Sequence, residues 1–218
     1  MSEWLVPPSN RTLTPFVSRA TREDPLDWWQ PVDLVVYHYT ATGPGAGPRG
    51  SERARMERWL GGGTARSSTH FVILRDGTVL QAAGLGRRTW HSGRSEFQGR
   101  SGVNAFSIGV DLENAGPLAG GWEPYTPEQV AALRRLVYQL VMEFPALEDP
   151  AHHVGHEDVT ARKRDPGPAF PWDVVREAAA QAAADRPPET HDAASPGSNA
   201  ANIFFVLAVG AAAWLVLS

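Results

Sequence analysis

Two histidines and one aspartate occupy positions from which they could share a metal ion. His38 follows the apolar, β-branched run 34–37, which predicts a buried strand that ends in polar residues. His156 and Asp165 lie together in the later segment 155–168, where prolines stiffen the chain just after the aspartate. Two imidazoles and a carboxylate suit Zn²⁺, and three protein ligands leave the fourth position to water, as in catalytic zinc sites. Spacing alone leaves open that these are ordinary hydrogen-bonded side chains.

Three further charged residues could serve acyl-transfer chemistry beside such a metal. Asp111 and Glu113 alternate with apolar residues in a predicted strand at 106–113, so both carboxylates share its polar face. A carboxylate there can accept a proton from water and pass it to a leaving amine. Lys163 precedes Asp165 by two residues, so in an extended segment it points the same way and could stabilise an oxyanion. The alternatives are an exposed strand face and a solvated lysine.

The elements that position these residues follow from apolar periodicity, turn residues and helix caps. Residues 84–104 and 145–171 are expected to be loops, the first long enough to indicate a function. The middle helix begins behind Thr126, with Gln129 completing a capping box. Its buried stripe is expected to comprise Val130, Leu133, Val137, Leu140 and Val141. Strands are expected at 34–40, 69–74, 78–82 and 106–113, and helices at 52–60, 127–143 and 172–184.

Composition narrows the function classes. The 218 residues are 42% hydrophobic and 20% charged, which is enough for one packed domain. The net charge of -4 provides no basic excess for binding a phosphate backbone, so we expect no nucleic-acid partner. The chain has no cysteine, which excludes disulfides, thiol nucleophiles and thiolate zinc sites. No HExxH motif is present, which argues against a zinc peptidase.

The chain divides by composition into four parts. Residues 1–30 are expected to form an irregular arm without a secretory signal, and 31–184 to form the catalytic domain. Residues 185–199 have the composition of a flexible linker, in which His191 is expected to be inert. Residues 200–218 are apolar and, at about 1.5 Å per residue, only just long enough to span a bilayer as a helix. We expect this last part to be an apolar helix that anchors the chain to a membrane.

Five ordered segments, which together span roughly residues 30–180, carry a resemblance to a known family. They are VVYHYTA (35–41), STHFVILRDGTVLQ (68–81), RTWHSGRSEFQGR (88–100), NAFSIGVDLEN (104–114) and GHEDVTARKRDPGPAFPW (155–172). The chain resembles the zinc-dependent N-acetylmuramoyl-L-alanine amidases of the type 2 class, which are similar in fold to peptidoglycan recognition proteins. The sequences of these segments are most similar to those of the cytosolic branch that recycles anhydro-muropeptides.

The resemblance implies an α/β (α+β) fold with a mixed central β-sheet flanked by helices. It also implies that Zn²⁺ assists hydrolysis of the amide between the lactyl group of muramic acid and L-alanine. By this resemblance, the family's zinc ligands fall on His38, His156 and Asp165, and its oxyanion-stabilising lysine falls on Lys163. The family's cleft-lining segments contain His70, Trp90, His91 and Asn104 of this chain. We expect these four residues to bind substrate or to support residues that do.

Two departures from the family pattern bear on catalysis. Asp111 stands where most catalytic relatives of this branch have glutamate, so either the shorter Asp111 serves as acid and base or Glu113 substitutes. The interval between His156 and Asp165 is one residue tighter than in that branch. Because of the first departure, a non-catalytic module that binds peptidoglycan or muropeptides is the alternative function.

Substrate form and cellular setting stay open. Intact peptidoglycan and anhydro-muropeptides are both compatible with the resemblance, as are a recycling enzyme and a phage endolysin. We expect a monomer that is synthesised in the cytoplasm and tethered to the membrane by its C-terminal segment.

Overall fold

The computed structural model describes residues 5–11, 31–41 and 67–187. The expected helix at 52–60, most of the arm 1–30, nearly all of the linker with His191, and the segment 200–218 lie outside these ranges. Within the described ranges, no helix combines the length and the apolar character needed to cross a membrane.

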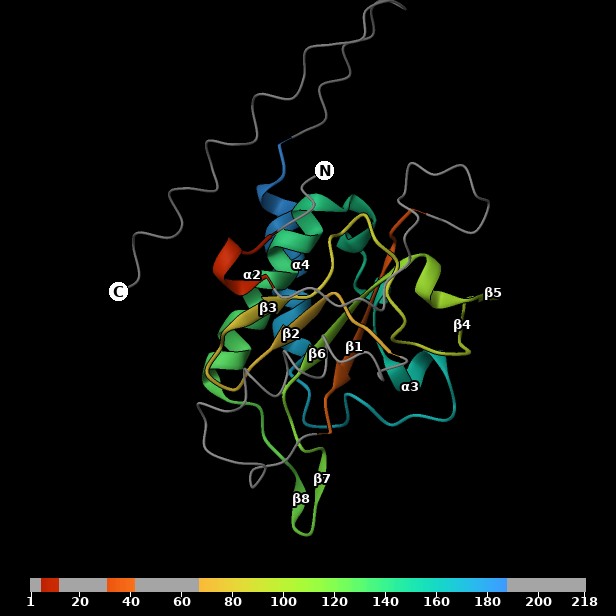
Figure 1. Cartoon of the computed structure of the whole chain (residues 1–218). Helices are drawn as coiled ribbons and strands as arrows, with labels where there is room; N and C mark the ends of the chain where they lie inside the picture. The colour runs from red at the N-terminus through yellow and green to blue at the C-terminus, as the bar shows by residue number, and fades with distance from the viewer. Residues whose placement is uncertain (1–4, 12–30, 42–66, 188–218) are drawn as a thin grey trace, which may run out of the picture. The chain divides into compact units, whose positions relative to one another are not determined.

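A five-stranded sheet lies at the centre of the domain, in the order β3-β2-β6-β1-β9 (Figure 1). β2 and β3 pair antiparallel across the expected turn at Asp76-Gly77, whereas the other neighbouring pairs are parallel. The expected mixed central sheet is therefore confirmed. Its strands are β1 (Leu34–Tyr39), β2 (Phe71–Ile73), β3 (Val79–Gln81), β6 (Ser107–Leu112) and β9 (His153–Gly155).

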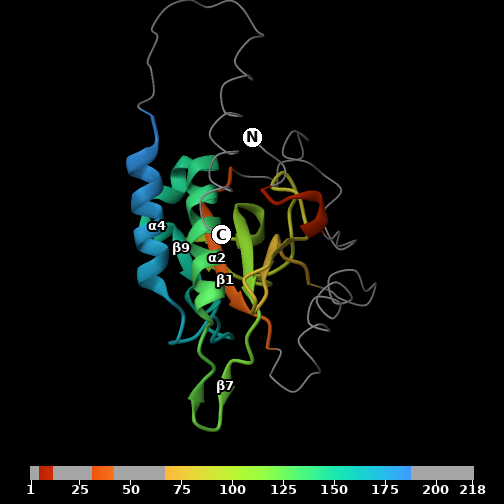
Figure 2. The same ribbon diagram turned by 90° about the vertical axis from the view of Figure 1, so that its left-hand side faces the viewer.

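Two long helices, α2 (Pro127–Glu143) and α4 (Trp172–Asp185), pack together against one face of this sheet (Figure 2). The expected capping box of α2 is present: the Gln129 amide N–H donates to Thr126 Oγ1, and the Thr126 N–H donates to Gln129 Oε1. The Gln129 side chain turns inward and donates to the carbonyl of Glu113 at 2.8 Å. Gln129 is thus part of the buried face, together with Ala132 and Leu136, whereas Val130 was wrongly included in the expected stripe.

The other face of the sheet is covered by shorter elements. Side chains alternate along a strand, so Leu34, Val36 and His38 point away from α2 and α4. Leu34 and Val36 pack there in a second apolar cluster. Its other buried members come from η3 (Val103–Ala105), from the residues around it, and from β9 and α3 (His156–Val159). This face is where His38 meets the remaining site residues.

Both expected loops contain short elements that periodicity could not reveal. The 84–104 loop holds the hairpin of β4 (Glu96–Phe97) and β5 (Arg100–Ser101), and the 145–171 loop holds β9 and α3. Elements of two to four residues are too short to show a hydrophobic period. Among the described residues, the remaining short elements are the hairpin of β7 (Pro117–Leu118) and β8 (Gly121–Trp122) and the 3-10 turns Pro8–Asn10, Pro145–Glu148 and Pro150–His152.

Candidate metal centre

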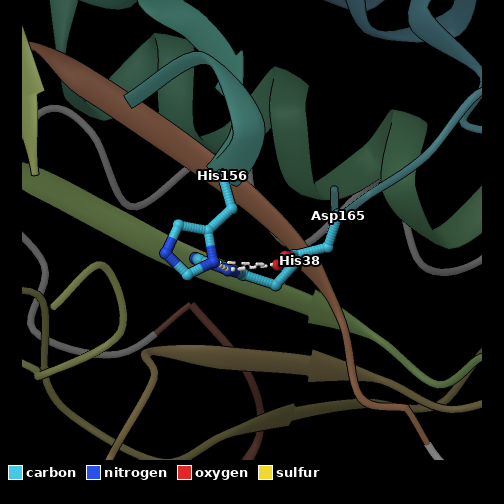
Figure 3. Close-up of side chains that lie close together, drawn as sticks. All are labelled: His38, His156 and Asp165. Atoms are coloured by element: carbon cyan, nitrogen blue, oxygen red, sulfur yellow. Dashed lines mark hydrogen bonds and ion pairs between the residues drawn. The ribbon is translucent and has the colours of Figure 1, made fainter. Parts of the chain in front are cut away.

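His38, His156 and Asp165 converge at the carboxyl ends of two neighbouring strands (Figure 3). His38 lies near the end of β1, and His156 comes directly after β9, which pairs in parallel with β1. Carboxyl ends of parallel strands lie at the same edge of a sheet, so two imidazoles 118 positions apart become neighbours. Asp165 reaches the same point from the loop that follows α3.

The three donor atoms form a nearly equilateral triangle. His38 Nδ1 lies 3.0 Å from His156 Nδ1 and 2.9 Å from Asp165 Oδ2, and 3.0 Å separates His156 Nδ1 from the same carboxylate oxygen. All three side chains are buried. Burial acts to raise the pKa of Asp165, but the adjacent imidazoles of His156 and His38 outweigh it and hold that pKa well below its usual range. The carboxylate is therefore ionised.

This donor set fits a metal ion better than it fits a hydrogen-bonded cluster. A neutral imidazole presents either a proton or a lone pair at Nδ1, and an ionised carboxylate only accepts. Whichever protons His38 and His156 carry, at least one of the three contacts sets lone pair against lone pair or proton against proton. A cation among the three atoms removes the conflict, and two nitrogens with one oxygen are ligands that zinc accepts.

Asp111 lies directly beside His38. The two residues are paired across β1 and β6, and both side chains point to the face away from the long helices. Burial raises the pKa of Asp111, an effect that His38 and a hydrogen bond from Thr69 partly offset. The alternative of an ordinary exposed strand face is wrong for β6, because all six of its residues are buried.

Asp111 and the three candidate ligands line a cavity of about 220 Å³. Lys163 also lines it, although its side chain is otherwise exposed. Glu113 does not line it: its Oε2 accepts the amide proton of Arg75 at 3.3 Å. The complete lining is His38, Tyr39, Thr40, Ala41, Ser67, Ser68, His91, Asp111, His156, Lys163 and Asp165.

The segment His91–Ser92 borders the two histidines on the side away from the triangle. His38 Nε2 lies 3.0 Å from His91 Nδ1, and His156 Nε2 lies 3.3 Å from the Ser92 carbonyl oxygen. Asn104 does not line the cavity; its Oδ1 accepts the amide protons of both His91 and Ser92. Burial first, then the nearby imidazoles, lower the pKa of His91 well below its ordinary value, so its ring is neutral.

His70 and Trp90, which the sequence placed among the substrate-binding candidates, lie outside the cavity lining. His70 is fully buried, and its ring nitrogens contact the Arg87 carbonyl, the Thr89 hydroxyl and the Gly109 amide. This places it as a connection between the 84–104 loop and β6. Trp90 is 37% exposed, and the Arg88 guanidinium lies 4.2 Å from its ring centroid.

Several residues of this region were missed by the sequence reasoning. Tyr39, Thr40 and Ser68 line the cavity, and the only available signal was that they stand within the family-like segments. His153, which falls in the expected loop 145–171, is buried in β9. Its Nε2 donates to the Leu147 carbonyl and its Nδ1 accepts from the Tyr37 hydroxyl at 2.8 Å.

Comparison with known proteins shows which family of proteins this chain is similar to. A family model described as N-acetylmuramoyl-L-alanine amidase matches residues 28–168. The 1,6-anhydro-N-acetylmuramyl-L-alanine amidase AmpD of Salmonella typhimurium is 41% identical over 112 residues, which is 51% of this chain and 56% of that protein. The chain thus spans about half the length of the curated relatives that it matches.

Solved structures share the fold. The crystal structure of a selenomethionine derivative of AmpD superposes with a TM-score of 0.62 and 28% identity, covering 82% of this chain and 97% of that one. The amidase AmiD of Escherichia coli was solved with anhydro-N-acetylmuramic acid-L-Ala-D-gamma-Glu-L-Lys as substrate. It superposes with a TM-score of 0.55 and 27% sequence identity, covering 72% of this chain and 61% of that one.

Proposed function

Because the chain belongs to the N-acetylmuramoyl-L-alanine amidase family, we propose that it hydrolyses the amide between the muramic acid lactyl group and L-alanine. The substrate is peptidoglycan or a muropeptide released from it. The observation that carries the proposal is the triangle of His38, His156 and Asp165 beside the buried Asp111, all opening into one cavity. Binding of an anhydro-muropeptide by AmiD supports a small soluble substrate.

Zn²⁺ is the proposed cofactor, held by His38 Nδ1, His156 Nδ1 and Asp165 Oδ2. When bound, it supplies Lewis acidity for the attack of water on the amide carbonyl. The three ligands are buried, and at least one contact among them stays unfavourable without a cation, which supports retention of the ion.

Asp111 is the proposed acid and base. Its carboxylate accepts the proton of the attacking water and returns it to the departing L-alanine nitrogen. The raised pKa suits both halves of this task, because it makes the carboxylate a better base and the carboxylic acid easier to form. Lys163 is proposed to place its ammonium group beside the oxyanion that develops on the carbonyl. Glu113 stays the alternative to Asp111, with its contact to Arg75 arguing against it.

Turnover of a defined substrate tests the proposal. Full-length protein with stoichiometric zinc is incubated with anhydro-N-acetylmuramyl-tripeptide and, separately, with intact sacculi, and free peptide is quantified by mass spectrometry. Release of a peptide with a free L-alanine amino group supports the amidase. Tight binding without release would instead assign the non-catalytic binding module.

We further propose, from the sequence pattern alone, that residues 200–218 form an apolar helix that tethers the enzyme to a membrane. Fractionation of cells that express the full chain is compared with a variant that ends at Ala184. Full-length protein in the membrane fraction and the shorter one in the soluble fraction is the expected result. Equal partition of the two would refute the tether.

A further inference from the structure

We propose that His91 is a positioning residue, which acts through a directed chain of hydrogen bonds to hold the His38 ring with its Nδ1 lone pair facing the metal. The inference rests on the proposed zinc site but concerns this chain's own residues. It gives the half-buried His91 a role in metal affinity rather than in substrate binding.

The chain of hydrogen bonds starts at the candidate ligand and ends at the backbone. His38 Nε2 lies 3.0 Å from His91 Nδ1, and His91 Nε2 lies 3.1 Å from the Ser107 hydroxyl. Ser107 Oγ lies 2.7 Å from the carbonyl oxygen of Val103. Each link has the length of an ordinary hydrogen bond.

The carbonyl at the end of the chain sets the direction of every proton in it. A carbonyl only accepts, so the Ser107 hydroxyl donates to Val103 and offers its oxygen to His91 Nε2–H. A neutral His91 that is protonated at Nε2 carries a lone pair at Nδ1, which accepts from His38 Nε2–H. With its proton at Nε2, His38 presents an unprotonated Nδ1 to His156 and Asp165, which is the form that binds a metal.

Two further features hold the His91 ring in place. A Cβ built on Gly109 would lie 2.7 Å from His91 Cγ, so the ring packs where β6 lacks a side chain. Asn104 Oδ1 accepts the His91 and Ser92 amide protons, and the Ser92 carbonyl lies within reach of His156 Nε2. Both candidate histidine ligands therefore contact the same short segment, His91–Ser92.

One contact opposes this arrangement. The Ser92 hydroxyl lies 2.9 Å from His91 Nδ1 and competes with His38 for the lone pair on that nitrogen.

Zinc affinity and histidine tautomers test this inference in the full-length protein. Dissociation constants are measured by competition with a chromophoric chelator for the wild type, His91→Leu, His91→Asn and the control Thr89→Val. Thr89 is buried in the same loop and contacts His70 rather than a candidate ligand, so its substitution reports loosening of the loop alone. The visible spectrum of the cobalt-substituted proteins and the long-range ¹H–¹⁵N spectrum of the zinc-loaded wild type complete the comparison.

His91→Leu is expected to weaken zinc binding about 10- to 100-fold and to alter the cobalt spectrum, because the outer partner of a ligand is lost. His91→Asn, which returns an acceptor oxygen near the Nδ1 position, is expected to recover most of the affinity. Thr89→Val is expected to lower the melting temperature without changing affinity or spectrum. In the wild type, His91 should be protonated at Nε2 only.

Three results separate this inference from the proposed function. If wild-type protein binds no zinc, the metal site itself fails, and the role of His91 fails with it. If the wild type binds zinc and His91→Leu binds it equally well, the positioning role is overturned while the amidase proposal stands. A His91 proton at Nδ1 in the loaded protein would likewise overturn it.

Discussion

Asp111 stands directly opposite His38 across the parallel pairing of β1 and β6, on the face that the long helices leave free. The Asp111 carboxylate is thus carried by the strand next to the one that carries a candidate metal ligand, and both strands lie in the interior of the sheet. Aspartate is one methylene shorter than the glutamate typical of the resembling branch. Asp111 nevertheless lies beside His38 and lines the cavity, which supports the proposal that the shorter side chain serves as acid and base.

Replacement of Asp111 should therefore affect turnover more than replacement of Glu113. Asp111→Asn keeps the shape but removes the proton acceptor, so kcat should fall by about 10²-fold or more. Glu113→Gln should lose less than about tenfold, and Asp111→Glu should keep measurable activity. Steady-state kinetics on a muramoyl-peptide compare the three variants. Equal losses in Asp111→Asn and Glu113→Gln would leave the assignment of the base without support.

Lys163 should contribute to kcat without contributing to metal binding. Loss of its ammonium group in Lys163→Met removes charge beside the developing oxyanion, and kcat should fall by about 10²-fold with zinc affinity unchanged. The neighbouring Arg162 is exposed and does not line the cavity, so Arg162→Met is the matched control and should keep full activity. A Lys163→Met enzyme as fast as the control would contradict the role.

Removal of the metal should abolish activity and lower stability together. Exhaustive chelation of the wild type should lower its melting temperature, and zinc should restore both stability and activity by binding the folded state. Asp165→Asn should bind zinc far more weakly and show little of this recovery. The control is Asp158→Asn, because Asp158 Oδ2 accepts the Gly155 amide proton at 2.7 Å and is not a candidate ligand. Full activity of the chelated wild type would remove the metal from the mechanism.

His153 should make the free energy of unfolding fall in mild acid. Burial lowers its pKa from 6.5 to about 4, whereas the unfolded chain keeps the ordinary value. Between these values the unfolded state binds more protons, so stability declines as the pH falls from 6.5 to about 4 and is unaffected by this group above that window. At about 1.4 kcal/mol per pKa unit the loss amounts to at most about 3.5 kcal/mol.

Urea unfolding of the metal-free protein at several pH values measures that loss. His153→Gln should remove its share of the pH dependence and lower stability at neutral pH, where the contacts to Tyr37 and Leu147 disappear. His152→Gln is the control, because the His152 side chain is more exposed and its Nδ1 contacts the Ala146 carbonyl rather than Tyr37 or Leu147. The same pH dependence in wild type and His153→Gln would refute the assignment.

Gly109 should be intolerant of even one added methyl group. Alanine there would bring its Cβ to 2.7 Å from His91 Cγ and 2.9 Å from Thr69 Oγ1. Overpacking of this kind costs about 1–3 kcal/mol and should displace the His91 ring, so zinc binding should also weaken. Gly86→Ala is the matched control, since nothing lies within 4 Å of its added Cβ. Melting temperatures and zinc titrations of both variants decide the point, and unchanged values for Gly109→Ala would contradict the close packing.

Most of the fold could be predicted from local sequence patterns, namely apolar runs, alternation of apolar and polar residues, and helix caps. The apolar run before His38, the alternation around Asp111 and the capping box at Thr126 each predicted an element that the structure contains. β9 and α3 were missed, because elements of three and four residues show no period. The burial of Gln129 was missed for a different reason, since its side chain donates to the carbonyls of Ile73 and Glu113, which are distant in the sequence.

The sequence by itself determined which side chains were chemically able to act: seven imidazoles, several carboxylates, one lysine and no thiol. Tertiary structure decided which of them meet. Parallel pairing of β1 with β6 and β9 brings His38 beside both Asp111 and His156, and the 84–104 loop folds His91 behind His38. Contacts between residues more than 50 positions apart depend on strand order and loop path, and neither leaves a local signal in the order of the residues.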